Sequence, residues 1–340
     1  MNEQALLDRA RAGDERAYDL LVEPHRGELR AHCYRMLGSA HDAEDALQDA
    51  LLRAWRGLGG FEGRSALRPW LYTIATNTCL KAIERRPKLV LPIDYGPPAD
   101  PHRAPGVPLV ESIWVEPYPG DRLALGGGLA GPEARYEQQE SVELAFIAAL
   151  QHLPARQRAV LILRDVLGFS AREVAQTLEM TPPAVDSALQ RAHKTVDDRL
   201  PERSQQANLR ALGDERLRAL VGEYVAAWER SDVEAVVALL AQDAALTMPP
   251  IPEWYRGRAA ITVFLRAYPL RGGLRWRAVE TRANGQPAFA HYLYSDEHER
   301  FIAHSITVLT LDGGQIAEMT VFMTPAAFAG FGLPDEQAVG

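Results

Sequence analysis

Basic and aromatic side chains gather in one stretch of this sequence, between residues 53 and 88. This stretch carries eight Arg or Lys against two Glu, a net charge of +6, whereas residues 1–52 carry eleven Asp or Glu against six Arg, a net charge of −5. Fields between exposed charges are screened beyond about 10 Å at ordinary salt, so a polyanion responds to local charge. The spacing therefore indicates a nucleic-acid site, although the whole chain is acidic with a net charge of −8.

The candidate side chains of this stretch combine cations, aromatic rings and short hydrogen-bonding groups. Rings stack only on bases that have left the duplex, so this mixture suits an unpaired strand. The candidates are Phe61, Arg64, Arg68, Tyr72, Thr73, Thr76, Asn77, Lys81, Arg85 and Arg86. Trp70 and Tyr72 cannot face the same way on a helix. We expect Trp70 to be the buried one, because Ile74 lies four residues further on.

A second DNA-reading pattern lies at residues 170–195, which have the proportions of a helix-turn-helix. Ser170 should cap a first helix with Glu173 as its capping-box partner, and Thr181 should cap a second helix with Pro182 at its first position. A helix of this kind can enter the major groove and reach base edges. The expected DNA contacts are Arg172, Thr181, Ala184, Ser187, Gln190, Arg191 and Lys194, while Val185 and Leu189 would face inward. A plain helical hairpin is the alternative.

The elements that position these groups are predicted by periodicity. Residues 1–88 indicate helices throughout, and residues 42–55 have one apolar stripe with Asp42, Asp45, Gln48 and Asp49 on the opposite face. A second helix should run from about residue 69 to residue 86. Residues 89–131 contain eight Pro and seven Gly, which excludes a helix or a packed strand pair and indicates a linker. Its patch of apolar and aromatic residues, with Trp114 and Tyr118, should dock on another part of the protein.

The remainder of the chain changes period. Helices are expected over residues 133–200 and from about residue 214, with Ser231 and Glu234 forming a capping box for a further helix. β-rich runs follow at residues 274–281, 287–295, 300–311 and 315–323, separated by turn signals that include Asn284-Gly285. Helices followed by antiparallel strands predict an α+β domain.

The bulk composition excludes several classes of protein. At 340 residues the chain is long enough for two or three domains. It has no apolar run of membrane-spanning length and no signal-peptide pattern, so we expect a cytoplasmic protein without a membrane partner. Cys33 and Cys79 stand alone in apolar surroundings, which favours buried thiols over a metal site. No metal and no cofactor is predicted.

Three parts of the chain together resemble regions 2 and 4 of the extracytoplasmic-function sigma factors of bacterial RNA polymerase. These parts are the acidic helix 42–55, the segment 61–86 and the helix-turn-helix 170–195. The C-terminal block resembles the cone-shaped SnoaL-like fold of polyketide cyclases and ketosteroid isomerases. The resemblance implies a multidomain chain of two all-α sigma domains, a Pro/Gly-rich linker and an α+β cone. The corresponding divisions are region 2 at 1–88, the linker at 89–131, region 4 at 132–203 and the SnoaL-like domain at 210–332.

The resemblance also implies partners and roles. The face formed by Asp42, Asp45, Gln48 and Asp49 would bind core RNA polymerase, and the two candidate sets above would read the −10 and −35 elements of promoter DNA. Trp114 and Tyr118 would dock between domains, so that the cone holds the DNA-binding domains in an inactive arrangement. A separate anti-sigma factor or a small-molecule ligand of the cone is a further possible partner. Glu179 departs from the family pattern, which usually has Gly in this turn.

The cone itself could bind a ligand or carry out a reaction. Its candidate pocket residues are aromatic or imidazole side chains, namely Tyr224, Trp228, Trp254, Tyr255, Trp276, His291 and His304. Asp232 and Asp243 lie near helix ends, where capping explains them, so we assign no catalytic residue and expect a non-catalytic initiation factor. Two alternatives remain open: a SnoaL-like isomerase or hydrolase with a DNA-binding front end, and a helix-turn-helix repressor that works without polymerase.

Overall fold

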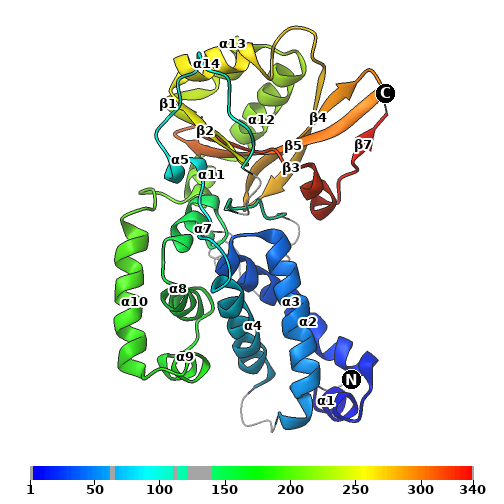
Figure 1. The fold of residues 1–340 in the computed structure, drawn as a ribbon, viewed down its shortest axis with the longest axis vertical. Coiled ribbons are helices and arrows are strands. Elements are labelled where there is room, and N and C mark those ends of the chain that lie inside the picture. Colours follow the sequence, from blue (N-terminus) through cyan, green and yellow to red (C-terminus); the bar gives the residue numbers. More distant parts are fainter. Residues whose placement is uncertain (1–2, 62–65, 110–112, 121–139, 339–340) are drawn as a thin grey trace. The chain divides into compact units, whose positions relative to one another are not determined.

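The computed structural model describes residues 3–61, 66–109, 113–120 and 140–338 (Figure 1). The chain divides into two compact units. Unit 1 comprises residues 1–88 and 122–200, and unit 2 comprises residues 89–121 and 201–340. Among the described residues no helix combines the length and the apolar character needed to cross a membrane.

The first part of unit 1 is a helical bundle. Its helices are α1 (Glu3–Arg11), α2 (Glu15–Leu37), α3 (Ala40–Gly57) and α4 (Leu67–Ile83). Asp14 caps α2, and Gly38 ends it in the left-handed conformation with φ 71°. Helix α3 buries Ala43, Ala46, Leu47, Ala50, Leu51 and Ala54, which confirms the predicted stripe. Cys33 and Cys79 are free, buried thiols in this bundle, as expected.

The described residues of the second part of unit 1, 140–200, form further helical elements. They are α7 (Leu144–Gln151), α8 (Ala155–Leu161), a π-helical turn (Ile162–Val166), α9 (Ala171–Leu178) and α10 (Pro182–Asp197). The breaks between them fall at the predicted turns, around residues 152–154, 167–170 and 179–181. Helices α9 and α10 form the predicted helix-turn-helix.

Unit 2 is the α+β domain, which confirms the predicted fold class. Its helices are α5 (Pro92–Tyr95), α11 (Gln205–Leu212), α12 (Asp214–Glu229), α13 (Val233–Ala238) and α14 (Arg258–Ala267), with a 3-10 helix at Pro325–Phe331. Its strands are β1 (Leu240–Met248), β2 (Ile251–Arg256), β3 (Trp276–Ala283), β4 (Gln286–Ser295), β5 (Arg300–Asp312), β6 (Gln315–Phe322) and β7 (Glu336–Gln337). The sheet order is β2-β1-β6-β5-β4-β3, with β7 paired to β5.

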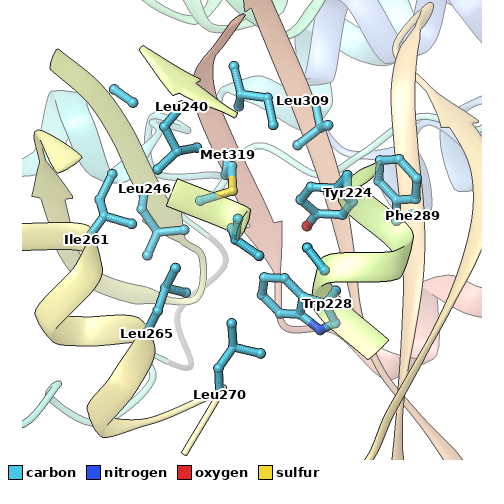
Figure 2. Packing of buried hydrophobic residues seen from close by; sticks show 14 of the residues in the cluster. Tyr224, Trp228, Leu240, Leu246, Ile261, Leu265, Leu270, Phe289, Leu309 and Met319 are labelled. Atoms are coloured by element: carbon cyan, nitrogen blue, oxygen red, sulfur yellow. The ribbon is translucent and has the colours of Figure 1, made fainter. Parts of the chain in front are cut away.

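One face of this sheet packs against α12, α13 and α14 and forms the core of unit 2. Figure 2 shows Tyr224 and Trp228 of α12 opposite Leu309 and Met319 of the central strands. The strand pairs are antiparallel except β1 with β6, which is parallel. The β3–β4 turn consists of Asn284 and Gly285, both with positive φ, as the sequence predicted.

One local prediction in unit 2 is wrong, and two strands were not predicted. Strands β1 and β2 were not expected, because the exposed Gln242 and Asp243 interrupt the alternation of buried and exposed residues in β1. The predicted cap Ser231 has φ 53°, whereas an N-cap residue is normally extended. Asp232 caps α13 instead, since its side chain accepts a hydrogen bond from the backbone N–H of Ala235.

Candidate nucleic-acid interface

The predicted strand-holding residues of α4 divide into an exposed and a buried group. Asn77, Lys81, Arg85 and Arg86 are exposed towards the C-terminal end of α4 and just after it. Arg68 and Thr73 are partly exposed. Arg64 lies outside the described residues. A row of cations with one amide at the end of a helix can bind phosphate groups.

Three predicted members of this group are buried, and the expected orientation of the aromatic residues is wrong. Tyr72 is only 1% exposed and its hydroxyl donates to Glu28 Oε2 at 3.3 Å, whereas Trp70 is partly exposed and packs on Phe61 with ring centroids 4.8 Å apart. Phe61 is itself buried, and Thr76 is fully buried with its Oγ1 2.9 Å from His32 Nε2. Helix α4 buries more than one stripe because α2, α3, α8 and α9 all contact it.

The electrostatics of this buried part favour neutral groups. Burial raises the pKa of the Tyr72 hydroxyl and lowers the pKa of His32 to about 3. His32 therefore stays neutral at physiological pH and cannot attract phosphate. The positive charge available to DNA comes from the exposed end of α4.

The helix-turn-helix has the predicted caps. Ser170 Oγ and Ser170 N each donate to Glu173 Oε2 at 2.7 Å, and these two bonds lower the pKa of the Glu173 carboxyl. Glu173 N in turn donates to Ser170 Oγ at 3.3 Å. The Oγ1 of Thr181 accepts from Ala184 N at 3.4 Å. Glu179 occupies the left-handed region with φ 53°, the conformation that Gly adopts most readily. The departure from the family pattern therefore does not prevent the turn from forming.

Helix α10 presents a polar face to solvent. Its buried residues are Val185, Ala188, Ala192 and Val196, so Ala188 takes the place predicted for Leu189, which is only partly buried. Ala184 is partly buried. The other predicted DNA contacts are exposed, namely Arg172, Thr181, Ser187, Gln190, Arg191 and Lys194. This arrangement can present cations and short polar side chains to a DNA groove.

The acidic face of α3 is partly occupied by the chain itself. The carboxylate of Asp42 pairs with the guanidinium of Arg86. Asp45 lies 3.7 Å from His41 and, like Gln48 and Asp49, is exposed. A polymerase surface would thus meet three exposed polar side chains and one that already has a cationic partner.

Residues 89–109 and 113–120 lie against the sheet of unit 2 and are called the strap here, and the predicted docking residues belong to it. Trp114 is 8% exposed and Tyr118 is 1% exposed. The strap meets one sheet edge where Ala99 N donates to Trp254 O at 2.8 Å. It meets the β3 end where Tyr118 N donates to Asn284 Oδ1 and Asn284 N donates to Tyr118 O, both at 2.8 Å. The sequence marked Asn284 only as a turn residue and gave no sign of this second role.

The end of the strap fits closely on β3. Gly120 N donates to Arg282 O at 2.8 Å, and a Cβ on Gly120 would lie 2.7 Å from the Cβ of Arg282. A glycine is therefore required for this approach. The described parts of the predicted linker, residues 89–109 and 113–120, belong to unit 2. They include the short helix α5, so the prediction that the Pro and Gly content excludes a helix is wrong at Pro92–Tyr95.

The interior of the cone contains a cluster of rings with few polar partners. His291 is fully buried, its Nε2 lies 3.3 Å from the Tyr224 hydroxyl, and its ring centroid lies 4.5 Å from that of Trp228. Trp276 packs edge-on to His304 at 4.9 Å. Burial lowers the pKa of His291 to about 3, lowers that of His304, and raises that of Tyr224. Among the described protein atoms, His291 Nδ1 and Trp228 Nε1 have no hydrogen-bond partner.

Two of the predicted pocket residues lie on opposite faces of β2. Tyr255 belongs to the interior cluster, whereas Trp254 points to the other face and its indole N–H donates to Gly96 O of the strap at 2.7 Å. Trp254 is therefore removed from the candidate pocket. Successive strand residues alternate between faces, so this correction could have been made if β2 had been predicted.

Family models match three parts of the chain. The model described as Sigma-70 region 2 matches residues 21–88, Sigma-70, region 4 matches residues 143–196, and the SnoaL-like domain matches residues 221–319.

Curated relatives extend the likeness over nearly the whole chain. The ECF RNA polymerase sigma factor SigG of Mycobacterium tuberculosis is 41% identical over 326 residues, which cover 95% of this chain and 86% of the relative. The ECF RNA polymerase sigma-E factor of Escherichia coli is 29% identical over 206 residues, covering 59% of this chain and 95% of the relative. The crystal structure of the M. tuberculosis extracytoplasmic function sigma factor SigJ covers 91% of this chain and 97% of that one, with a TM-score of 0.56 and 22% identity. The similarity to the SigJ structure supports the fold described above.

Proposed function

This chain belongs to the extracytoplasmic-function sigma factors, with a SnoaL-like domain at its C-terminus, and we propose that it directs core RNA polymerase to a restricted set of promoters. The observation that carries the proposal is the exposed polar face of α10, which displays Gln190, Arg191 and Lys194 beside the capped turn of the helix-turn-helix. This face would read the −35 element. Asn77, Lys81, Arg85 and Arg86 would hold phosphates of the −10 element.

The polymerase contact would come from the α3 face of Asp42, Asp45, Gln48 and Asp49. Exposed charges at the rim of an interface set orientation and association rate more than affinity. Because Asp42 pairs with Arg86, polymerase binding at Asp42 would free this arginine for DNA. The expected order is therefore polymerase first and promoter second.

The test is run-off transcription with purified core RNA polymerase from the source bacterium, on promoters mapped by sequencing transcripts after induction. The sigma role predicts specific transcripts from core polymerase plus this protein and weak binding of the free protein to the same DNA. Tight binding to the duplex without polymerase, and no transcript with it, would instead indicate a repressor.

We assign a regulatory role to the cone and include the strap in the regulatory unit. The functional divisions we propose are residues 1–88 for region 2, 132–203 for region 4 and 210–332 for the SnoaL-like domain, with residues 89–120 attached to the last. The support is the set of backbone bonds that join the strap to Trp254, Asn284 and Arg282. A truncation near residue 205 would leave the strap without its sheet, so the cone and the strap should be perturbed separately.

The chemistry of the interior supports ligand binding over catalysis. A histidine with a pKa of about 3 is a weak base at physiological pH. Asp232 caps a helix and Asp243 is exposed. An apolar ligand with a group that hydrogen-bonds to His291 Nδ1 or Trp228 Nε1 would suit the cluster. Isothermal titration with candidate polyketides or steroids, combined with turnover assays, separates the two roles.

A further inference from the structure

The chain on either side of region 4 is hydrogen-bonded to one β-turn of the cone. Before region 4, the end of the strap lies at this turn, where Tyr118 and Asn284 are joined by two hydrogen bonds of 2.8 Å. After region 4, the chain enters α11, where Gln206 Nε2 donates to the carbonyl oxygen of Gly285 at 2.8 Å. Asn284 and Gly285 are the two residues of the β3–β4 turn. This turn therefore holds both connections of region 4.

The bonds at this turn are buried, and neighbouring bonds support them. Asn284 is fully buried, and Gln205 and Gln206 are each 4% exposed. Gln205 bonds both the N–H and the C=O of Leu311, which holds the start of α11 on β5. A buried polar group that loses its partner is costly, so these bonds favour a closed arrangement. The bonds of Tyr118, Gly120, Gln205 and Gln206 to the strands are called the clasp here.

A further pair of bonds shortens the linker before it reaches the clasp. Val90 N donates to Ile113 O at 2.8 Å, and Val115 N donates to Val90 O at 3.1 Å. These bonds join the beginning of the strap to its last part, so the residues between them add nothing to the distance that the linker can span. The chain from the end of α4 to the strap is then residues 84–88.

While the clasp is closed, two short connections limit the reach from region 2 to region 4. Residues 84–88 lead from α4 to the strap, and residues 198–204 lead from α10 to α11. At about 3.4 Å per residue they span at most about 17 Å and about 24 Å. A compact unit of about 170 residues, such as unit 2, has a radius of gyration of about 16 Å and measures roughly 40 Å across. The total reach is therefore about 80 Å.

The promoter requires a separation of the same size. The names of the −10 and −35 elements place them about 25 base pairs apart, or about 85 Å of B-form DNA at roughly 3.4 Å per base pair. Both ends of the reach lie at predicted DNA contacts, since Arg85 and Arg86 follow α4 and Lys194 is in the last turn of α10. Without the clasp, the chain between α4 and α7, residues 84–143, could extend to about 200 Å. The clasp thus reduces a wide range of possible spacings to a narrow one.

We propose that the clasp sets the spacing between the −10 and −35 elements that this sigma factor accepts, with Asn284 as the positioning residue. The inference rests on the proposed sigma function. It concerns which promoters are read, whereas regulation by the cone concerns how strongly they are read. The clasp stays closed while the promoter is bound, and a promoter with a longer spacer is read only when the clasp opens.

The first test measures transcription from promoters that differ only in spacer length. Run-off templates carry the mapped promoter with its own spacer and with spacers one to three base pairs shorter or longer, and each yield is divided by the yield at the native spacing. Asn284→Gly removes the acceptor of Tyr118 N, so the relative yield at the longer spacers should rise at least about threefold. Glu299→Gly, in the β4–β5 turn, should keep the profile of the unaltered protein.

A second variant opens the clasp at a different bond. Gly120→Ala places a Cβ 2.7 Å from the Cβ of Arg282, so the end of the strap should move off β3 and the spacer profile should broaden. Gly272→Ala is the matched control, because a Cβ at Gly272 would meet nothing within 4 Å. A Gly120→Ala protein that has the circular dichroism of the unaltered protein and also its spacer profile would contradict the proposal.

A reversible lock tests the clasp in the opposite direction. Pro119 and Ala283 lie opposite each other in an antiparallel bridge, and the flanking bonds, Gly120 N to Arg282 O and Asn284 N to Tyr118 O, show that they form a non-hydrogen-bonded pair. The Cα atoms of such a pair are about 4.5 Å apart, a distance that a disulfide can span.

The lock is Pro119→Cys with Ala283→Cys, introduced into the Asn284→Gly protein. Oxidised glutathione takes up two electrons and two protons from the thiols as the S–S bond forms and becomes two molecules of glutathione, and dithiothreitol reverses the reaction. The native Cys33 and Cys79 are fully buried, so the Asn284→Gly protein without the added thiols is the oxidation control.

We expect oxidation to restore the narrow spacer profile of the unaltered protein and reduction to return the broad one. A broad profile in the oxidised protein, or thiols that do not join, would overturn the proposal. Loss of transcription at every spacing on oxidation would also overturn it, because the strap would then have to leave the turn during initiation. An unaltered protein that gives no transcript at the native spacing would instead contradict the sigma function.

Discussion

Replacing Asn284 with glycine should release the strap while leaving the C-terminal unit folded. Asn284 has φ 56° in the β3–β4 turn, a conformation that glycine adopts without strain. The change removes the Oδ1 atom that accepts from Tyr118 N at 2.8 Å and leaves this buried N–H without that acceptor. An unsatisfied buried donor costs about 1–3 kcal/mol. Local opening of the strap should therefore become roughly 5- to 150-fold more frequent.

Hydrogen exchange followed by mass spectrometry measures this opening directly. Peptides that contain residues 113–120 should exchange faster in the Asn284→Gly protein by that factor, and peptides from the central strands should be unchanged. Glu299→Gly is a matched control, because Glu299 also has positive φ, at 51°, and lies in the β4–β5 turn of the same sheet. If both variants exchange alike in the strap, the Asn284 side chain does not hold it. A released strap should also raise transcription, as expected for a cone that restrains the DNA-binding regions.

Three further predictions concern DNA binding and stability. Arg191→Ala should weaken binding of the polymerase complex to the −35 element and reduce the slope of log affinity against log salt by about one, whereas Asp186→Ala on the same helix should not reduce the slope. The pKa of His291 is about 3 in the folded protein, below the ordinary value of 6.5. As the pH falls from 6.5 towards 3, His291 therefore binds a proton in the unfolded chain but not in the folded one, and the free energy of unfolding decreases. His291→Phe should remove a slope of up to about 1.4 kcal/mol per pH unit in urea titrations, and an unchanged slope would refute this assignment. Gln205→Ala should cost about 1–3 kcal/mol of unfolding free energy, measured by urea denaturation, because Gln205 bonds both the N–H and the C=O of Leu311.

Features that depend on one element could be predicted from the sequence. The stripe of α3, the capping box of Ser170 and Glu173, and the Asn284-Gly285 turn all arise from residues close together in the chain. The order of the helical domains and the α+β domain follows from the same local patterns.

Features that depend on distant residues could not be predicted. The spacing of Trp70 and Ile74 favoured burial of Trp70, but Tyr72 is the buried ring because Glu28 and Phe169 approach it from other helices. The Pro-rich linker was expected to dock somewhere, yet its position on the sheet depends on Asn284, some 166 residues from Tyr118. Neither contact has a periodic signal in the sequence.

The reversal of charge between the first and second parts of region 2 is partly neutralised within the fold. Arg86, from the basic part, pairs with Asp42, and Arg68 lies 3.2 Å from Glu28. The partly exposed pair of Arg68 and Glu28 contributes only about 0–1 kcal/mol, so a phosphate can replace Glu28 at little cost. In the free protein these carboxylates compete with DNA for the same cations. Under the proposed function, we expect this acidic protein to read a promoter efficiently only after polymerase has engaged its acidic face.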